Sequence, residues 1–489
     1  MNRLTTKYLN APVILGAALF IYLVLRVFIM PISDDEFITV DLHASQSWWG
    51  VLTTAQPSVE WAPNNHILNT LFMKMEIALF GRKDWAVRLH ILASFAVCFY
   101  YVYKTLNLFT SSTTRQSLYL LVIFFNPYLL DFFGIARGYA MSIAAYSAAF
   151  YYFIIYTEHL SLTYLRNVFI ALFFSIWSNF SALYFLLLFS VLSGFVIYKN
   201  RHQIDYKKHL LYIAIACSAI LIVIFLPLIR TLASDQTFGG KTGIFQDCVV
   251  HYINQYIHFD HNINRYEVCA PGWKLTEVLA VVSLLFWALI HFISFLFPTK
   301  DNIAKIQYYT LALLAGIIII VKVLFIWKGT PYPTARTVLL FSMPFYLGVC
   351  ATCERIILKQ KNAVIGLFVF ISFLTFHFFS AVTFENTLEW WQNGDAKRVV
   401  SFLKEDLKNV KKDKMLVFGI DGWHYHSMAF YTEVEFKDIM KTQWTDLQTD
   451  AGFDYIYVPF DRKEKISNSF EAVGTFKHGI LFKAIPGKE

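Results

Sequence analysis

The chain has 489 residues, of which 57% are hydrophobic and only 16% are charged, a composition far more apolar than that of a soluble domain of this size. The formal net charge of +8 is no sign of nucleic-acid binding, because Lys and Arg concentrate in short connections between apolar runs, where membrane topology accounts for them. The composition therefore predicts a membrane protein and argues against a nucleic-acid partner.

Apolar runs long enough to cross a bilayer follow one another along the chain. A hydrocarbon core roughly 30 Å thick needs about 20 apolar residues in a helix, because each residue rises about 1.5 Å. The first run lacks the short cationic lead and small-residue cleavage site of a removable signal, so we keep it as a span. Eleven spans are predicted, at 11–30, 85–103, 116–133, 139–156, 160–178, 180–198, 210–229, 275–297, 306–327, 337–353 and 363–382.

The distribution of cations between these spans predicts their orientation. One alternating set of loops holds most of the Lys and Arg and is cytoplasmic by the positive-inside rule. Its cations are Arg3, Lys7, Lys104, Arg115, Arg166, Lys199, Arg201, Lys207, Lys208, Lys300, Lys305, Arg355, Lys359 and Lys361. The opposite short connections carry only Arg137, Lys328 and Arg336, and both long loops, 31–84 and 230–274, lie on that side. We therefore expect a cytoplasmic N-terminus and a C-terminus on the outer side.

From about residue 393 the composition becomes charged and typical of a soluble domain. A helix-like stretch covers 396–409, and 415–419 and 455–459 are strand candidates. We therefore predict an α-helical polytopic membrane domain at 1–392 and a small α/β domain at 393–489. Within the first long loop, an amphipathic stretch at 66–80 is expected to lie along the membrane interface.

Three adjacent carboxylates, Asp34, Asp35 and Glu36, lie where the first span leaves the membrane. Carboxylates are costly in hydrocarbon, so this cluster must meet water, a cation, a metal or a substrate. One interpretation is a solvated loop at a helix end. The other is a general base that takes a proton from an acceptor hydroxyl or amine at a water-accessible membrane edge.

Two arginines on the cation-poor side are candidates for phosphate binding. Arg137 and Arg336 each stand at the start of a predicted span. A lone Arg in such a place commonly extends to lipid headgroups, but guanidinium groups also bind phosphate bidentately. A phosphate-bearing lipid is therefore a candidate common ligand of both.

These stretches, in this order and on one membrane face, resemble the GT-C transferases that use polyprenyl-phosphate sugars, including protein O-mannosyltransferases and lipid A aminoarabinose transferases. Asp35 and Glu36 are similar to the family's first-loop acidic motif, and 80–89 is similar to the start of its second span. The stretch 136–140, and Arg336 with Pro344, match further family patterns. Residues 64–68 stand where the family often has His or Lys followed by Pro-Pro-Leu, and here both prolines are missing.

The resemblance implies a GT-C-like fold in a bacterial inner membrane and a sugar transfer with inversion at the anomeric carbon. The donor would be a polyprenyl-phosphate sugar and the acceptor a glycan, a lipid or a protein, at a periplasmic active site. Asp35 is the candidate base, Asp34 is its close rival, and Glu36 completes the acidic set.

The resemblance also assigns the remaining candidate residues. Arg336 would bind the donor phosphate, with Arg137 or Lys328 in support, and so stabilise the leaving group. Substrate positioning falls to His66, Asn65 and Tyr139, although a hydrogen-bonded structural role for His66 is equally open.

Other assignments stay open on the sequence. A transporter or flippase of lipid-linked sugars, an O-antigen polymerase or ligase, and a structural or receptor protein compete with the transferase. No cofactor is certain, and a divalent metal is open because an acidic pair also serves as a cation ligand. Weaker metal candidates are the pair His424 and His426 and the loop cluster at 251–261. Cys248 and Cys269 share one loop and could pair there.

Overall fold

The computed structural model describes residues 10–55, 65–234, 239–250, 252–253, 301–409, 415–447 and 452–487. Within these ranges seven helical segments are long and apolar enough to cross a membrane. They are Ala11–Ile29, Ala86–Asn107, Gly138–His159, Phe180–Lys199, Tyr206–Leu232, Asn302–Lys328 and Ala363–Ala381. Each coincides with a predicted span, which confirms a polytopic helical membrane protein.

Where the structure describes them, the other predicted spans form shorter or divided helices. The run at 116–133 forms two helices, α6 (Thr113–Phe124) and α7 (Pro127–Phe132), because Asn126 caps α7 and Pro127 cannot continue α6. The run at 160–178 forms α9 (Leu162–Ser178), which has 17 residues. The run at 275–297 lies outside the described residues.

The predicted span at 337–353 is also divided. It begins as a 3₁₀ segment, η7 (Ala335–Phe341), and continues as α15 (Ser342–Lys359). Glu354 in α15 is buried and pairs with Arg115 at 2.9 Å, so this helix carries charge into the bundle. Polar pairing of this kind explains why α15 is less apolar than a simple crossing.

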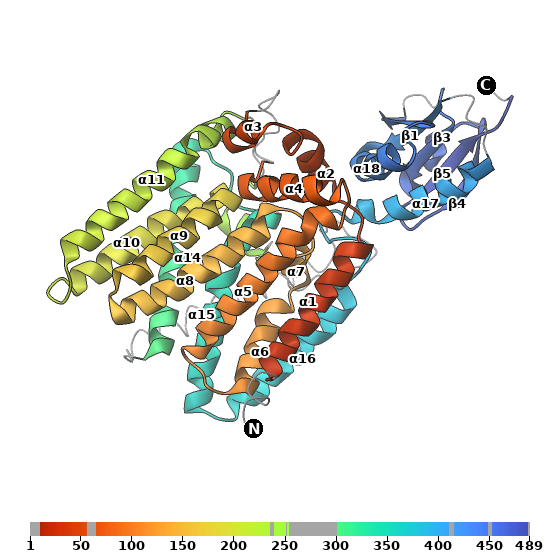
Figure 1. Cartoon of the computed structure of the whole chain (residues 1–489). Coiled ribbons are helices and arrows are strands. Elements are labelled where there is room, and N and C mark those ends of the chain that lie inside the picture. The colour runs from red at the N-terminus through yellow and green to blue at the C-terminus, as the bar shows by residue number, and fades with distance from the viewer. Residues whose placement is uncertain are drawn as a thin grey trace, which may run out of the picture.

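The centre of the bundle is α8 (Gly138–His159), which lies between α5 (Leu89–Asn107) and α9 (Figure 1). Helix α8 is buried along most of its length, as expected for a helix without a polar face. Its Ala and Ser residues allow close approach of neighbouring helices. Around this centre lie α1 (Ala11–Ile29), α10 (Leu183–Lys199), α11 (Tyr206–Leu232), α14 (Asn302–Lys328) and α16 (Ala363–Ala381).

The first long loop forms short helices at one end of the bundle (Figure 1). They are α2 (Asp34–Ile38), which continues into a π-helical turn η2 (Thr39–His43), then α3 (Trp48–Thr53) and α4 (Ile67–Phe80). Ser33 starts α2 with a capping box, in which its hydroxyl accepts from the Glu36 amide while the Glu36 carboxylate accepts from the Ser33 amide. The predicted amphipathic stretch at 66–80 corresponds to helix α4.

The C-terminal domain contains a five-stranded sheet in the order β2-β1-β3-β5-β4. Strands β1 (Leu416–Asp421), β2 (Met440–Thr445) and β3 (Tyr455–Pro459) are parallel, and β4 (Phe470–Thr475) and β5 (Gly479–Ala484) are antiparallel to their neighbours. One sheet face packs against α17 (Ala396–Asp406) and α18 (Tyr425–Glu435). This confirms a small α/β domain.

The C-terminal domain is joined to the first loop by buried polar contacts, with α18 beside α2 (Figure 1). The Ser427 hydroxyl donates to the carbonyl of Ile32 at 2.6 Å, and the Ile32 amide donates to the Tyr431 hydroxyl at 2.9 Å. Tyr431 in turn donates to Asp84 at 2.8 Å. The segment just before α2 is therefore held by the C-terminal domain.

Candidate active site

Glu36 is held in a closed ion pair. Its two oxygens accept from Arg88 Nε and Nη2 at 2.7 Å each, and also from the amides of Ser33 at 2.8 Å and Ala136 at 2.6 Å. Glu36 and Arg88 are both fully buried. The carboxylate thereby ties α2 to the segment before α8, an arrangement that favours an anchoring role over proton transfer.

Asp35 faces two arginines from distant parts of the chain. Its Oδ2 lies 3.1 Å from Nη2 of Arg137, which precedes α8, and 3.7 Å from Nη2 of Arg336, in η7. Burial by itself would raise the pKa of Asp35, but the charges of Arg137 and Arg336 outweigh it and hold the pKa below its usual value. Asp35 is thus an ionised carboxylate between two guanidinium groups.

Asp34 has different partners from those of Asp35. Its Oδ1 accepts from Asn393 Nδ2 at 2.9 Å and its Oδ2 from Gln392 Nε2 at 3.2 Å. Burial raises the pKa of Asp34 to about 7, although the two amide donors act in the opposite direction. Successive helical residues point about 100° apart, which is why neighbouring acids reach different partners.

Arg336 is shared between Asp35 and a residue after the last span. Its Nη1 pairs with Glu389, which also accepts from the Tyr128 hydroxyl. The guanidinium carbon lies 5.5 Å from the centre of the Trp390 ring, a cation–π contact. Two acidic partners and an aromatic ring therefore position Arg336 beside Arg137.

His66 and Tyr139 lie next to the arginines. His66 Nδ1 is 2.9 Å from the carbonyl of Ser178 and therefore carries the proton, and the His66 ring meets the Tyr139 ring edge-on at 5.2 Å. Burial and then the charge of Arg137 hold the pKa of His66 well below its usual value, so the imidazole is neutral. Its buried Nε2 has no hydrogen-bond partner among the described residues.

Asn65 and Lys328 lie outside this cluster. Asn65 donates to the Val51 carbonyl at 3.1 Å and the Thr54 hydroxyl at 3.0 Å, contacts that brace the end of α3. Lys328 is exposed at the end of α14, where its ammonium lies 4.6 Å from the centre of the Trp327 ring. The structure therefore brings together Asp35, Arg137, Arg336, His66 and Tyr139, but not these two predicted residues.

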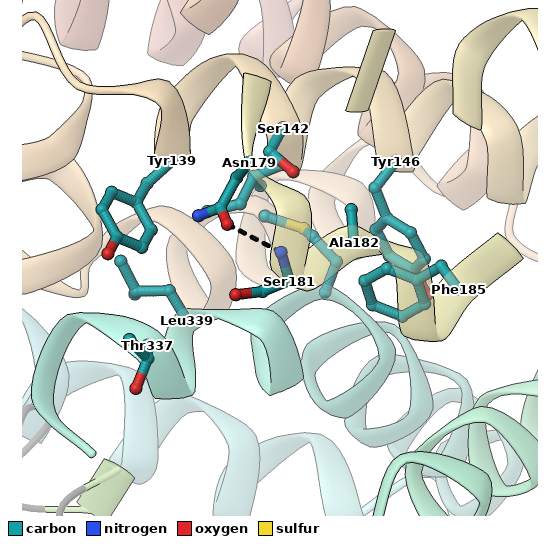
Figure 2. Close-up of a pocket in the computed structure, with 11 residues that line it drawn as sticks. Tyr139, Ser142, Tyr146, Asn179, Ser181, Ala182, Phe185, Thr337 and Leu339 are labelled. Carbon is teal, nitrogen blue, oxygen red and sulfur yellow. Dashed lines mark hydrogen bonds between the residues drawn. The ribbon is translucent and has the colours of Figure 1, made fainter. Parts of the chain in front are cut away.

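A small cavity of about 20 Å³ opens beside the cluster, between α8 and η7. Figure 2 shows Tyr139 and Thr337 at one end of it and Tyr146 and Phe185 at the other. Tyr139 is the residue of the cluster that also lines this cavity.

Several residues of the site were not predicted from the sequence. They are Arg88, Glu389, Trp390, Gln392 and Asn393. Arg88 lies in the stretch 80–89 that resembles the family, but that pattern assigned it no partner. Residues 389–393 directly follow the last span, where a carboxylate and two tryptophans at the membrane edge were the available signal.

Metal candidates find little support in the part of the chain that the structure describes. There, no three His, Cys, Asp or Glu side chains are grouped as metal ligands would be. His424 Nδ1 is 2.9 Å from the carbonyl of Gln392, and His426 Nδ1 lies 3.9 Å from Asp34. Residues 251 and 254–261 of the loop cluster and Cys269 lie outside the described ranges, whereas Cys248 is a buried free thiol.

Comparison with known proteins gave no matching family model and no matching curated protein. Among solved structures, the chain is similar to ArnT from Cupriavidus metallidurans bound to undecaprenyl phosphate. The two share 12% identity and a TM-score of 0.42, over 97% of this chain and 98% of that chain. The apo ArnT structure matches at 12% identity and a TM-score of 0.39, over 96% of this chain and 97% of that chain.

Proposed function

We propose that this chain is an inverting glycosyltransferase that moves a sugar from a polyprenyl-phosphate donor to an acceptor. The observation that carries the proposal is the position of the Asp35 carboxylate, 3.1 Å from Arg137 and 3.7 Å from Arg336. Guanidinium pairs bind phosphate oxygens, and a carboxylate beside them can accept a proton. The family motifs quoted above lead to the same residues.

In the proposed reaction, an acceptor hydroxyl or amine attacks the anomeric carbon on the face opposite the phosphate. The new bond to the acceptor forms as the bond from the anomeric carbon to the phosphate oxygen breaks, which inverts the configuration. The acceptor proton passes to Asp35. Arg137 and Arg336 stabilise the negative charge that grows on the departing polyprenyl phosphate.

We assign supporting roles to His66 and Tyr139. A neutral imidazole whose Nε2 has no hydrogen-bond partner among the described residues can accept a hydrogen bond from a sugar hydroxyl. Tyr139 lines the cavity beside the arginines and can stack on a sugar ring. Glu36 then acts as an anchor that fixes the direction of Asp35 through Arg88.

The location of this reaction is also a proposal. The positive-inside pattern supports a cytoplasmic N-terminus and a periplasmic C-terminal domain in a bacterial inner membrane. Because the C-terminal domain contacts α2, the acid–arginine cluster lies at the same end of the bundle as that domain. The acceptor, whether glycan, lipid or protein, would then approach from the outer side.

The test is sugar transfer or release by the purified protein from a panel of radiolabelled polyprenyl-phosphate sugars. Asp35→Asn is expected to lower turnover by about 10² to 10⁴, the usual contribution of a general base, and Arg336→Ala is expected to reduce it strongly. Asp41→Asn is the matched control, because Asp41 lies on the same loop but is half exposed and forms its ion pair with Arg82, at 3.6 Å.

Other outcomes of the same assay separate the competing functions. If Arg137 and Arg336 are required while Asp34 and Asp35 are dispensable, the polymerase or ligase assignment replaces the transferase. If no donor turns over but the protein moves lipid-linked sugar across a vesicle bilayer, the flippase assignment replaces the transferase.

A further inference from the structure

We propose that Asn393 and Gln392 are positioning residues of the sugar transfer, because their hydrogen bonds favour the ionised form of the Asp34 carboxylate beside Asp35. This inference rests on the proposed function. It makes the C-terminal domain a working part of the active site, since both amides lie where the chain enters that domain.

Both side-chain hydrogen bonds to Asp34 among the described residues come from beyond the last span. Asn393 donates at 2.9 Å and Gln392 at 3.2 Å, and the backbone of Ser427, like these two amides, acts to lower the pKa of Asp34. Ser427 lies in the first turn of α18, an 11-residue helix whose N-terminal end carries a partial positive charge. Each of these donors favours the ionised form of Asp34.

The two amides are themselves held by the frame of the C-terminal domain. His424 Nδ1 lies 2.9 Å from the Gln392 carbonyl. Asp395, two residues after Asn393, accepts from the Tyr457 hydroxyl at 2.7 Å and from the amides of Lys477 at 3.1 Å and His478 at 2.6 Å. The linker between the last span and α17, which contains residues 392–395, is therefore fixed to the sheet by hydrogen bonds. The position of the two amides thus depends on the docked C-terminal domain.

The charge on Asp34 matters for its neighbour. The titratable groups that face Asp34 are Asp35 on α2 and His426 on α18, 3.9 Å away. Burial lowers the pKa of His426, so near neutral pH it does not supply a compensating charge. The negative charge of an ionised Asp34 raises the proton affinity of the neighbouring Asp35 and so makes Asp35 a better proton acceptor. Protonation of Asp34 removes this effect.

The first test measures thermal unfolding of the full chain in detergent as a function of pH. Burial raises the pKa of folded Asp34 to about 7, against about 3.9 when unfolded, so its stabilising contribution is complete below pH 4 and is lost as pH rises through 7. Asn393→Leu removes a donor to the ionised form, so the Tm gap from wild type should widen between pH 6 and 9. Gln392→Met should give a smaller change of the same sign and serves if Asn393→Leu does not fold.

Asn386→Leu is the matched control. Asn386 is also a buried asparagine of the linker, but its Nδ2 donates to the carbonyl of Thr387. Its Tm gap should therefore not change with pH, and Asp34→Asn should remove the pH dependence from the Asn393 variant. If the Tm difference from wild type stays constant with pH in both Asn393→Leu and Gln392→Met, the assignment of the amides to Asp34 is overturned.

The second test measures turnover against pH with a donor that the wild type uses. Asn393→Leu should move the acidic limb of the kcat profile up by about one pH unit, the effect of one hydrogen bond to a charged group. KM for the donor should stay unchanged, because the arginines bind it. An equal loss of kcat at every pH would show a merely structural role. If the wild type turns over no donor, the proposed function fails, while the unfolding test still decides whether the amides hold Asp34.

Discussion

At the scale of single residues, the proposed function requires the donor phosphate to bind the same two arginines that Asp35 contacts. In the structure its carboxylate neutralises Arg137 and Arg336, so an incoming phosphate must compete with it for the same guanidinium groups. The two anions then share the positive charge. This competition connects donor binding to the proton affinity of the proposed base.

Binding of polyprenyl phosphate should reveal that competition without any turnover. Asp35→Asn removes the competing charge and should tighten binding by about tenfold, equivalent to about 1.4 kcal/mol. Arg336→Ala should weaken it by a similar factor. Titration calorimetry with the purified variants measures both. Weaker binding by Asp35→Asn would mean that the carboxylate contacts the ligand directly instead of competing with it.

The closed pair of Glu36 and Arg88 makes a second prediction at this scale. Arg88→Met leaves a buried carboxylate without its partner and should lower the unfolding free energy by about 3–5 kcal/mol. Denaturation in detergent measures the loss, with Arg82→Met as control, because Arg82 makes only partly exposed pairs. Equal effects of the two substitutions would contradict an anchoring role for the Arg88 pair.

At the scale of elements, the junction of α8, α9 and α4 sets the position of His66. Gly138 begins α8, and a Cβ there would overlap the carbonyl oxygen of Ser178 and lie 2.8 Å from the Cβ of His66. Ser178 is the last residue of α9 and its carbonyl holds the His66 ring. A side chain at position 138 would therefore force the three elements apart.

Gly138→Ala is accordingly expected to lower the unfolding free energy by about 1–3 kcal/mol, the usual cost of overpacking, and to reduce donor turnover. Gly194→Ala is the control, because a Cβ at that position in α10 has nothing within 4 Å. That substitution should stabilise the helix by up to about 1 kcal/mol. Thermal unfolding and donor turnover distinguish the two; a neutral Gly138→Ala would show that the junction adapts freely.

At the scale of the whole molecule, the C-terminal domain supports the first loop through α18. The Tyr431 hydroxyl both accepts from the amide of Ile32 and donates to Asp84, so it links the domain to two parts of that loop. Asp84 also pairs with Lys397 of α17 at 2.5 Å. Weakening these contacts should therefore destabilise α2 before it destabilises the helical bundle.

Tyr431→Phe removes that hydroxyl and leaves the Ile32 amide unpaired, at a cost of about 1–3 kcal/mol, whereas Asp84 keeps its ion pair with Lys397. Hydrogen exchange of the α2 amides should accelerate by about 10- to 100-fold, while α8 keeps its protection. Exchange followed by mass spectrometry measures both regions in one experiment. Unchanged exchange in α2 would show that the domain does not hold the loop.

Much of the architecture follows from local properties of the chain. The length of an apolar run and the cost of charge in hydrocarbon are set by the run itself, so seven predicted spans and the C-terminal α/β domain could be found without tertiary information. The same cost marked Asp34, Asp35, Glu36, Arg137 and Arg336 as unusual. The division of 116–133 at Asn126 and Pro127 was visible in the sequence but was outweighed by its apolar composition.

Only the tertiary structure decided which charged group meets which partner. The acids are adjacent in sequence, yet Glu36 pairs with a residue 52 positions away and Asp34 with one 359 positions away. Such distances carry no sequence period, and successive helical side chains point about 100° apart, so a shift of one residue exchanges all their partners. The sequence by itself thus determined the membrane class and the set of charged residues, whereas the positions of α2, the start of α8, η7 and the C-terminal domain determined the separate partners of those residues.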